Sequence, residues 1–180
     1  MLPWVAERPI SLIRCPQGRA KKCFFQKHDA SSFGDNVKHV AIREKNGSSQ
    51  PYLFVENADG LLTCVQMGTI EFHGWGTRVE DVEKPDRLVS DLDPDEDLGF
   101  DAVVRAALEF RELLTQVGLV TFPMVTGGKG VHVIAPLVPS AEWPAVKDFS
   151  RRFALAVAGA QPDRFTAACP SSEFLRQMAG

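Results

Sequence analysis

Apolar and polar positions alternate with a period of two through much of the first half of the chain, and this alternation predicts β-strands. We expect four strands there, at residues 38–43, 51–56, 61–66 and 69–73. The segments NGSSQP (46–51) and ENADG (56–60) contain the small and polar residues typical of the intervening turns. A further strand is predicted at 87–93, because Pro94 cannot continue the ladder of hydrogen bonds.

In the second half, the period changes to that of an amphipathic helix, which we expect over residues 101–118. Asp101 can cap its start and Gly118 fits the position after its end. The residues that follow the helical period are Val104, Ala107, Leu108, Arg111, Leu114 and Val117. A second helix is predicted over 140–159, opened by Ser140 and ended by Gly159.

Two β-rich runs, 119–125 and 131–137, flank the glycine turn TGGKG and predict a hairpin. Strands come first, and helices and strands then alternate. This order predicts an α+β fold in which antiparallel or mixed sheets pack against helices. At 180 residues, the chain fits a single domain over 1–180.

The composition of the chain also indicates where in the cell the protein is expected. No apolar run approaches the roughly 20 residues needed to cross a bilayer, and the first residues lack the pattern of a secretory signal. We therefore expect no membrane partner and a cytoplasmic location. The four cysteines, Cys15, Cys23, Cys64 and Cys169, show no metal-ligand spacing, which predicts reduced thiols.

Charge is distributed unevenly although the net charge is only −3. Residues 8–28, called here the basic segment, carry six Lys and Arg and no acid, whereas 80–101 carry ten Asp and Glu. A basic and an acidic segment in one small protein indicate a polyanion held near a cation site. A solvated basic loop remains an equal alternative at this point.

The motif DLD, at the end of the strand 87–93, places Asp91 and Asp93 on the same strand face as Val89. Two carboxylates that converge in this way can bind Mg²⁺ or Mn²⁺, which prefer oxygen ligands. An acidic turn after a strand is common, however, so the motif by itself is weak evidence for a metal site.

The DLD motif has two other interpretations. An EF-hand loop starting at Asp91 would need Gly and Glu where the chain has Glu96 and Ala102, and this interpretation is rejected. A haloacid-dehalogenase-type phosphotransferase, with Asp91 as nucleophile, is a weak alternative because Asp95 stands where Thr or Val is usual.

TGGKGVH (126–132) lacks the spacing of a Walker A loop. Its glycines can nevertheless turn backbone N–H groups toward an anion, Lys129 adds a mobile positive charge, and His132 can donate to a phosphate oxygen. A plain glycine hairpin is the competing interpretation, and it is favoured for this motif taken by itself.

Two aromatic segments complete the candidates. In KKCFFQKH (21–28), Phe24 or Phe25 can stack on a base, and strand spacing lets only one of the two face the core. In EFHGWGT (71–77), strand spacing places Glu71, His73 and Trp75 on one face. A structural polar cluster explains the second segment equally well without further context.

The segments KCFFQKH, YLFVENADGLLTCVQMGTIEFHGWG, RLVSDLDP and TGGKGVHVIAPL follow one another in an order seen in one family. The chain resembles the polymerase domain of bacterial ligase D, of the archaeo-eukaryotic primase superfamily, from Arg8 to about Ala167. The resemblance implies a primase-polymerase fold. It also implies a template-dependent nucleotidyltransferase that adds nucleotides, preferentially ribonucleotides, to DNA 3′ ends during non-homologous end joining.

The resemblance also assigns roles at the reaction centre. It implies that Asp91 and Asp93 hold two divalent ions, Mn²⁺ or Mg²⁺, and that Thr126, Lys129 and His132 grip the nucleoside triphosphate. Thr126 stands where many members have Ser and keeps the hydroxyl group. The family's His-x-Trp matches His73 and Trp75, which are expected near the nucleotide.

For DNA, the resemblance implies that Phe24 or Phe25 stacks on the template. It also implies that Lys22 and Lys27 lie toward the downstream 5′-phosphate of a DNA end. A Ku-type end-binding protein and a ligase are the implied protein partners, and the nucleoid is the implied place of action.

The sequence departs from the family in one respect. The family's third metal-binding carboxylate lies on a strand beyond the second helix, whereas here similarity fades after 163–167 and Glu173 is the one later acid. We therefore expect a C-terminally truncated domain that binds triphosphate but whose primer extension is very slow or undetectable. A non-catalytic binding module and a barely stable gene remnant are the alternatives.

Overall fold

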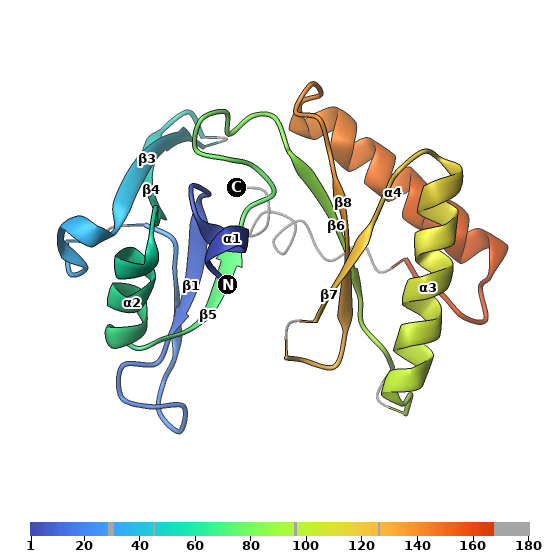
Figure 1. Ribbon diagram of the computed structural model, residues 1–180, viewed down its shortest axis with the longest axis horizontal. Helices are drawn as coiled ribbons and strands as arrows, with labels where there is room; N and C mark the ends of the chain where they lie inside the picture. Colours follow the sequence, from blue (N-terminus) through green and yellow to red (C-terminus); the bar gives the residue numbers. More distant parts are fainter. Residues whose placement is uncertain (29–30, 45, 96, 126, 168–180) are drawn as a thin grey trace. The chain divides into compact units, whose positions relative to one another are not determined.

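The computed structural model describes residues 1–28, 31–44, 46–95, 97–125 and 127–167 (Figure 1). The architecture is α+β, with antiparallel sheets and helices, as the order of elements predicted. The chain divides into two compact units, which are described separately here. Unit 1 comprises residues 1–83 and the chain from 151 onward, and unit 2 comprises residues 84–150.

Unit 1 is built on two small antiparallel sheets. The first has three strands in the order β2 (Phe24–Gln26), β1 (Ile10–Arg14) and β5 (Thr69–Gly74). The second pairs β3 (Lys38–Arg43) with β4 (Ser49–Phe54). The remaining elements are the helix α1 (Leu2–Val5), the 3-10 helix η1 (Gly34–Asn36) and the helix α2 (Ala58–Gln66).

The core of unit 1 gathers side chains from both sheets and from the two α-helices. Alternation along β1 turns Ile10 and Leu12 inward, and both side chains are fully buried. Partly buried Phe72 packs on the same cluster from β5. The buried members of the cluster are Val5, Ile10, Leu12, Phe33, Val37, Leu53, Val55 and Cys64.

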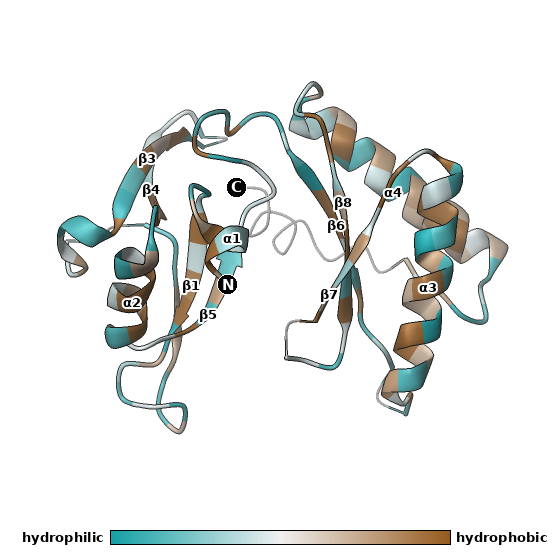
Figure 2. Ribbon diagram, viewed as in Figure 1, coloured by the Kyte–Doolittle hydropathy of each residue, from teal (hydrophilic) through white to brown (hydrophobic). Residues whose placement is uncertain are grey.

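Unit 2 contains one antiparallel sheet in the order β6 (Arg87–Leu92), β8 (Val131–Pro136) and β7 (Phe122–Val125). The pairing of β7 with β8 confirms the predicted hairpin. The helix α3 (Phe100–Gln116) packs against β8 and β6. The helix α4 (Trp143–Ala160) follows β8 in the chain. Hydrophobic and hydrophilic residues alternate along both helices (Figure 2).

The predicted strand at 61–66 is wrong, because these residues belong to the helix α2. Asn57 caps the helix, since its side chain accepts hydrogen bonds from the backbone N–H groups of Asp59 and Gly60. The segment read as a turn is therefore the start of a helix. Buried Cys64 and partly buried Leu61 lie on the face that meets the core.

Helix α3 begins at Phe100 with Gly99 as its N-cap, so the predicted cap at Asp101 is wrong. The end is as predicted: Gly118 follows the C-cap with a φ of 85°, the left-handed conformation that glycine adopts readily. The buried face also differs from the predicted one. It carries Val103, Phe110 and Leu114, whereas Val104 and Leu108 are exposed.

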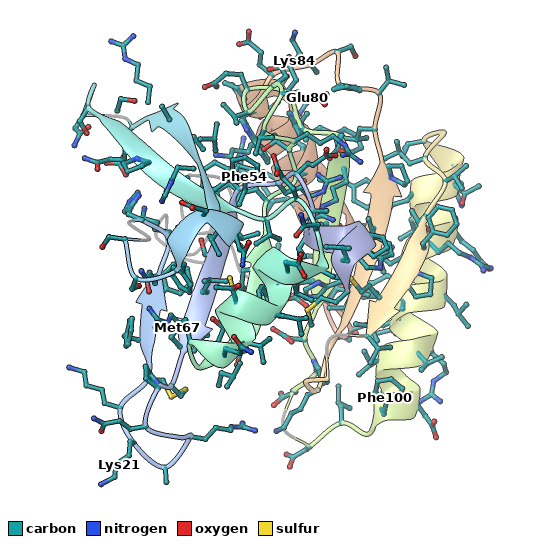
Figure 3. All side chains as sticks on the ribbon, turned by 60° about the vertical axis from the view of Figure 1, so that its left-hand side comes forward. Lys21, Phe54, Met67, Glu80, Lys84 and Phe100 are labelled. Atoms are coloured by element: carbon teal, nitrogen blue, oxygen red, sulfur yellow. A yellow bond between two sulfur atoms is a disulfide. The ribbon has the colours of Figure 1, made fainter. Side chains whose placement is uncertain are left out.

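The expectation that Cys15 and Cys23 are reduced is wrong, because the structure joins them in a disulfide. Arg14 pairs with Phe24 across the β1–β2 ladder, and the same register carries Cys15 to a place opposite Cys23. The bond closes the loop that carries Lys21 (Figure 3). Cys64 is a free and buried thiol, and Cys169 lies outside the described residues.

Within the described ranges, no helix combines the length and the apolar content needed to cross a membrane.

Candidate functional site

In unit 2, the acidic strand end meets the head of β8. Asp91 pairs directly with His132 across the β6–β8 ladder, and His132 Nε2 lies 3.3 Å from Asp91 Oδ1. Residues directly opposite in an antiparallel pair point to the same face, so this contact is a consequence of the register. Both side chains keep part of their surface in solvent, 33% for Asp91 and 21% for His132.

Asp93 follows β6 directly, and continuing the strand period by one residue places it on the same side as Asp91. Its carboxylate lies against the backbone at Gly130, where β8 is about to begin. The two carboxylates and His132 therefore share one end of one sheet face. Val89 and Ile134 form the next pair on this face, one step toward the middle of the sheet.

The donor set at this strand end suits a hard divalent ion in part. Among the described residues, no three His, Cys, Asp or Glu side chains gather in the manner of a complete metal site. Mg²⁺ is commonly held by one or two carboxylates, while waters and substrate phosphates complete its shell. Asp91 and Asp93 provide two carboxylates on one face, and the space at Gly130 accommodates one of them. The residues present therefore fit such an ion bound together with a phosphate ligand.

The glycine turn before β8 exposes a cation. Lys129 is exposed, and Gly127 adopts a φ of 91° that favours glycine. His132 Nδ1 is buried and has no hydrogen-bond partner among the described atoms. Thr126, the residue expected to contribute a hydroxyl group, lies outside the described residues.

In unit 1, a second group of predicted residues meets on the sheet β2-β1-β5. Phe25 and Glu71 both pair with Ile13, and His73 pairs with Ser11 on the same face. His73 Nε2 lies 3.2 Å from Glu71 Oε2, and the Phe25 and His73 rings are 6.3 Å apart. Phe25, Glu71 and His73 thus form an exposed aromatic and polar face, opposite the core face that carries Leu12.

Trp75, predicted to share a strand face with Glu71 and His73, differs from them in being buried, whereas both of those side chains are exposed. Strand β5 ends at Gly74, and the backbone N–H of Trp75 donates to the Pro9 carbonyl, one step beyond the Ile10–Gly74 pair. Trp75 is only 3% exposed, and its ring packs edge-to-face on Tyr52 at 5.0 Å. The residue contributes to the core of unit 1.

The register places Phe24 and Phe25 on opposite faces, as strand spacing predicted, with Phe24 opposite Arg14 and Phe25 opposite Ile13, but neither ring is buried. The two rings are 43% and 40% exposed, because β2 is an edge strand only three residues long. Their neighbours nevertheless distinguish them. The guanidinium of Arg14 lies 5.4 Å from the centre of the Phe24 ring, whereas Phe25 lies beside His73. Phe25 is therefore the residue of the pair that joins the exposed face.

Lys27 is held within a polar cluster around the buried Tyr52. Its ammonium donates to Tyr52 Oη at 3.3 Å and lies 3.8 Å from Glu44 Oε1. Tyr52 Oη in turn donates to Glu44 Oε1 at 3.1 Å. Burial, followed by the hydrogen bond and the charge of Glu44, raises the pKa of Tyr52 well above its usual range. His28 completes the cluster, with Nε2 3.5 Å from Glu44 Oε1.

The basic segment contains cations of two kinds. Arg8 and Arg14 are buried, and Arg14 donates to the Met67 carbonyl and to Gln26 Oε1. Arg19, Lys21 and Lys22 are exposed, in and beside the loop closed by the disulfide. The accessible positive charge of the segment is therefore concentrated in this loop.

Sequence reasoning missed three residues that shape these groups: Glu44, Tyr52 and Gly130. Glu44 and Tyr52 come from the β3–β4 hairpin, and no local motif connects them with Lys27. The position of Gly130 opposite Asp93 could have been found from the sequence. Once β6 and β8 are aligned through Asp91 and His132, simple counting places Gly130 opposite Asp93.

Comparisons with known proteins agree on one family. The model of the LigD primase-polymerase domain matches residues 1–173. The chain is 38% identical over 161 residues to the multifunctional non-homologous end joining protein LigD of Pseudomonas aeruginosa, covering 89% of this chain and 19% of that protein. It is 32% identical over 174 residues to the protein of the same name from Mycolicibacterium smegmatis, covering 96% of this chain and 23% of the relative.

A solved structure supports the same likeness in three dimensions. It is the polymerase domain from Mycobacterium tuberculosis ligase D in complex with DNA, with a TM-score of 0.80 and 28% sequence identity. The match covers 90% of this chain and 59% of that one. The chain thus spans only about a fifth of the length of the full relatives named above.

Proposed function

The chain belongs to the LigD primase-polymerase domain family, and from this membership we propose that it is a template-dependent nucleotidyltransferase acting on DNA 3′ ends. The proposed substrates are nucleoside triphosphates, preferentially ribonucleotides, and DNA ends that carry a 5′-phosphate. The observation that carries the proposal is the pair Asp91 and Asp93 on one sheet face, with His132 directly opposite Asp91. Family membership rules out the haloacid-dehalogenase alternative.

Asp91 and Asp93 would hold divalent ions, which we propose to be two Mn²⁺ or Mg²⁺. When bound, such ions activate the 3′-hydroxyl group and offset the charge of the triphosphate. The ladder between β6 and β8 holds the backbone of Asp91, and Asp93 follows directly after its last pair, Leu92 and Val131. His132 holds Asp91 from the neighbouring strand.

The triphosphate would be bound by Thr126, Lys129 and His132. Lys129 is exposed on the glycine turn and can reach an anion, and His132 is part of the same strand end as the carboxylates. We further propose that His73 approaches the nucleotide, since it lies on the exposed face of β5. The proposed role of Trp75 is indirect, because its side chain is buried against Tyr52.

DNA would contact the aromatic and basic residues of the segment 21–28 in unit 1. Phe25, which lies beside His73, is the proposed stacking residue. The neighbouring Phe24 ring is in contact with the guanidinium of Arg14. Lys22 would contact phosphate directly. Lys27 would do so more weakly, since Glu44 already offsets its charge. The relatives named above are bacterial end-joining proteins. On that ground, we propose a setting in double-strand break repair at the bacterial nucleoid, with a Ku-type protein and a ligase as partners.

Primer extension tests this proposal. The 180-residue chain is incubated with Mn²⁺, ribonucleotides and a primer–template that carries a downstream 5′-phosphate. Templated addition is expected, and Asp91→Asn should abolish it. Asp97→Asn is the matched control, because Asp97 is an exposed carboxylate of the same acidic loop. Equal extension by the parent and by Asp91→Asn would contradict the proposal.

The same assay separates catalysis from binding. A chain that binds Mn²⁺ and triphosphate yet adds no nucleotide would be a binding module. The rate of extension, compared with that of a relative's polymerase domain, measures how fast this chain adds nucleotides.

A further inference from the structure

The ladder between β6 and β8 ends one step before a further pair. Leu92 and Val131 are its last partners, and continuing the same register places Asp93 opposite Gly130. Directly opposite residues of an antiparallel pair direct their Cβ atoms to the same face. A side chain at position 130 would therefore lie on the face that carries the carboxylates of Asp91 and Asp93.

That space is already taken. A Cβ atom at position 130 would lie 2.5 Å from Asp93 Oδ1 and 2.7 Å from the carbonyl oxygen of Leu92. Both distances are shorter than a carbon and an oxygen tolerate without a shift of the structure. The carboxylate could rotate away, but the carbonyl belongs to the backbone of the strand. Gly130 is itself buried, so its surroundings have little freedom to yield.

The need for glycine at position 130 concerns space and not backbone conformation. The neighbouring Gly127 has a φ of 91°, and a Cβ atom there would meet nothing within 4 Å. Gly130 shows the reverse pattern, with no positive φ and with the close contacts given above. The two glycines of one turn therefore serve different purposes.

We propose that Gly130 is a positioning residue for Asp93. The missing side chain lets the Asp93 carboxylate lie across the start of β8, on the face where Asp91 is held by His132. This inference rests on the proposed function, since it concerns how the two carboxylates are presented to a divalent ion. It adds a residue that binds neither the ion nor the substrate and that acts through Asp93.

Binding of Mn²⁺ to the full chain, measured by calorimetry without nucleotide, tests the proposal. Gly130→Ala should lower the affinity for Mn²⁺ by tenfold or more, because the carboxylate is displaced. In an Asp93→Ala background, the same change at position 130 should have little further effect. The control is Gly159→Ala, since a Cβ atom at that exposed helical position meets nothing within 4 Å. Unchanged affinity in Gly130→Ala, or additive losses in the double variant, would overturn the proposal.

Urea denaturation provides a second readout in case Gly130→Ala folds poorly. If the Asp93 carboxylate is the group displaced, Gly130→Ala should destabilise the Asp93→Ala chain less than it destabilises the parent. Equal destabilisation in the two backgrounds would place the conflict at the Leu92 carbonyl and overturn the proposal. If the parent chain itself binds no Mn²⁺, the proposed function fails, and the denaturation cycle still decides the relation between Gly130 and Asp93.

Discussion

Arg14 lies inside unit 1 although it belongs to the basic segment 8–28. Its guanidinium donates to the Met67 carbonyl at 3.0 and 2.8 Å and to Gln26 Oε1. The guanidinium also lies over the Phe24 and Phe33 rings. Arg19, five residues later, is exposed on the loop closed by the disulfide. Two arginines of one segment thus have a structural and a surface role.

We expect Arg14→Ala to lower the free energy of unfolding by about 2–3 kcal/mol, because the partly buried Met67 carbonyl loses a charged hydrogen-bond donor. Arg19→Ala should change it by less than about 0.5 kcal/mol. Urea denaturation of both variants, followed by circular dichroism, measures the difference. Equal midpoints for the two variants would show that Arg14 does not support the fold.

Cys64 gives unit 1 a dependence on alkaline pH. Burial raises the pKa of this thiol from its ordinary value of 9.0 to about 11. Between these values, the unfolded chain loses the proton and the folded chain keeps it, so the unfolded state binds fewer protons. The stabilisation from Cys64 is therefore fully present below pH 9 and is lost as the pH rises toward 11.

Comparison with Cys64→Ala isolates this contribution, because other groups that titrate at high pH are common to both chains. The difference in unfolding free energy between the parent and the variant should shrink by up to about 2 kcal/mol between pH 8 and 11. Urea denaturation at intervals of one pH unit measures it. A difference that stays constant with pH would mean that the thiol is not protected by burial.

At the scale of elements, helix α2 depends on its N-cap residue, Asn57. Asn57 Oδ1 accepts from the N–H groups of Asp59 at 3.0 Å and Gly60 at 3.2 Å. Asn57→Ala should cost about 1 kcal/mol and lower the melting temperature by about 2–4 °C. Asn57→Asp keeps an acceptor at the same place and should melt close to the parent. Thermal unfolding that is unchanged in the alanine variant would contradict the capping role.

The β1–β2 hairpin is tied by the disulfide between Cys15 and Cys23, eight residues apart in sequence. A cross-link of this loop size lowers the entropy of the unfolded chain and thereby raises the free energy of unfolding by about 2–3 kcal/mol. Adding a thiol reductant should therefore lower the free energy of unfolding by that amount. Cys23→Ser should show the lower stability without reductant and no further change with it. A reductant effect of the same size in Cys23→Ser would assign the change to another cause.

At the scale of the whole molecule, a net charge of −3 opposes DNA, so binding must rest on local charge. The exposed loop with Arg19, Lys21 and Lys22 provides such charge. Lys27 is less available, because Glu44 Oε1 lies 3.8 Å from its ammonium. The accessible charges of the basic segment are thus a small subset of the 20 lysines and arginines of the chain.

The salt dependence of DNA binding measures this subset. Lys22→Ala should lower the slope of log affinity against log salt by about 0.9, the value for one phosphate contact, and Lys27→Ala by less. Arg105→Ala, which removes an exposed arginine from α3, is the control. Fluorescence anisotropy with a 5′-phosphorylated duplex end provides the slopes. An unchanged slope in Lys22→Ala would place the contact elsewhere.

Relations within one segment could be predicted from the sequence. The alternation along 87–93 placed Asp91 and Asp93 on one face, and the glycine turn between two β-rich runs predicted the β7–β8 hairpin. The order of several motifs was specific enough to indicate the family, which the family model confirms. These properties depend on periodicity and turn chemistry, which the chain carries locally.

Relations between segments were decided by the tertiary structure. The sequence did not show that Asp91 faces His132, that Gly130 makes room for Asp93, or that Cys15 meets Cys23. Packing also made 58–66 a helix and buried Trp75 and Arg14. The reason is physical: register and burial depend on which surfaces of distant segments meet, and a shift of one residue exchanges the two faces of a strand.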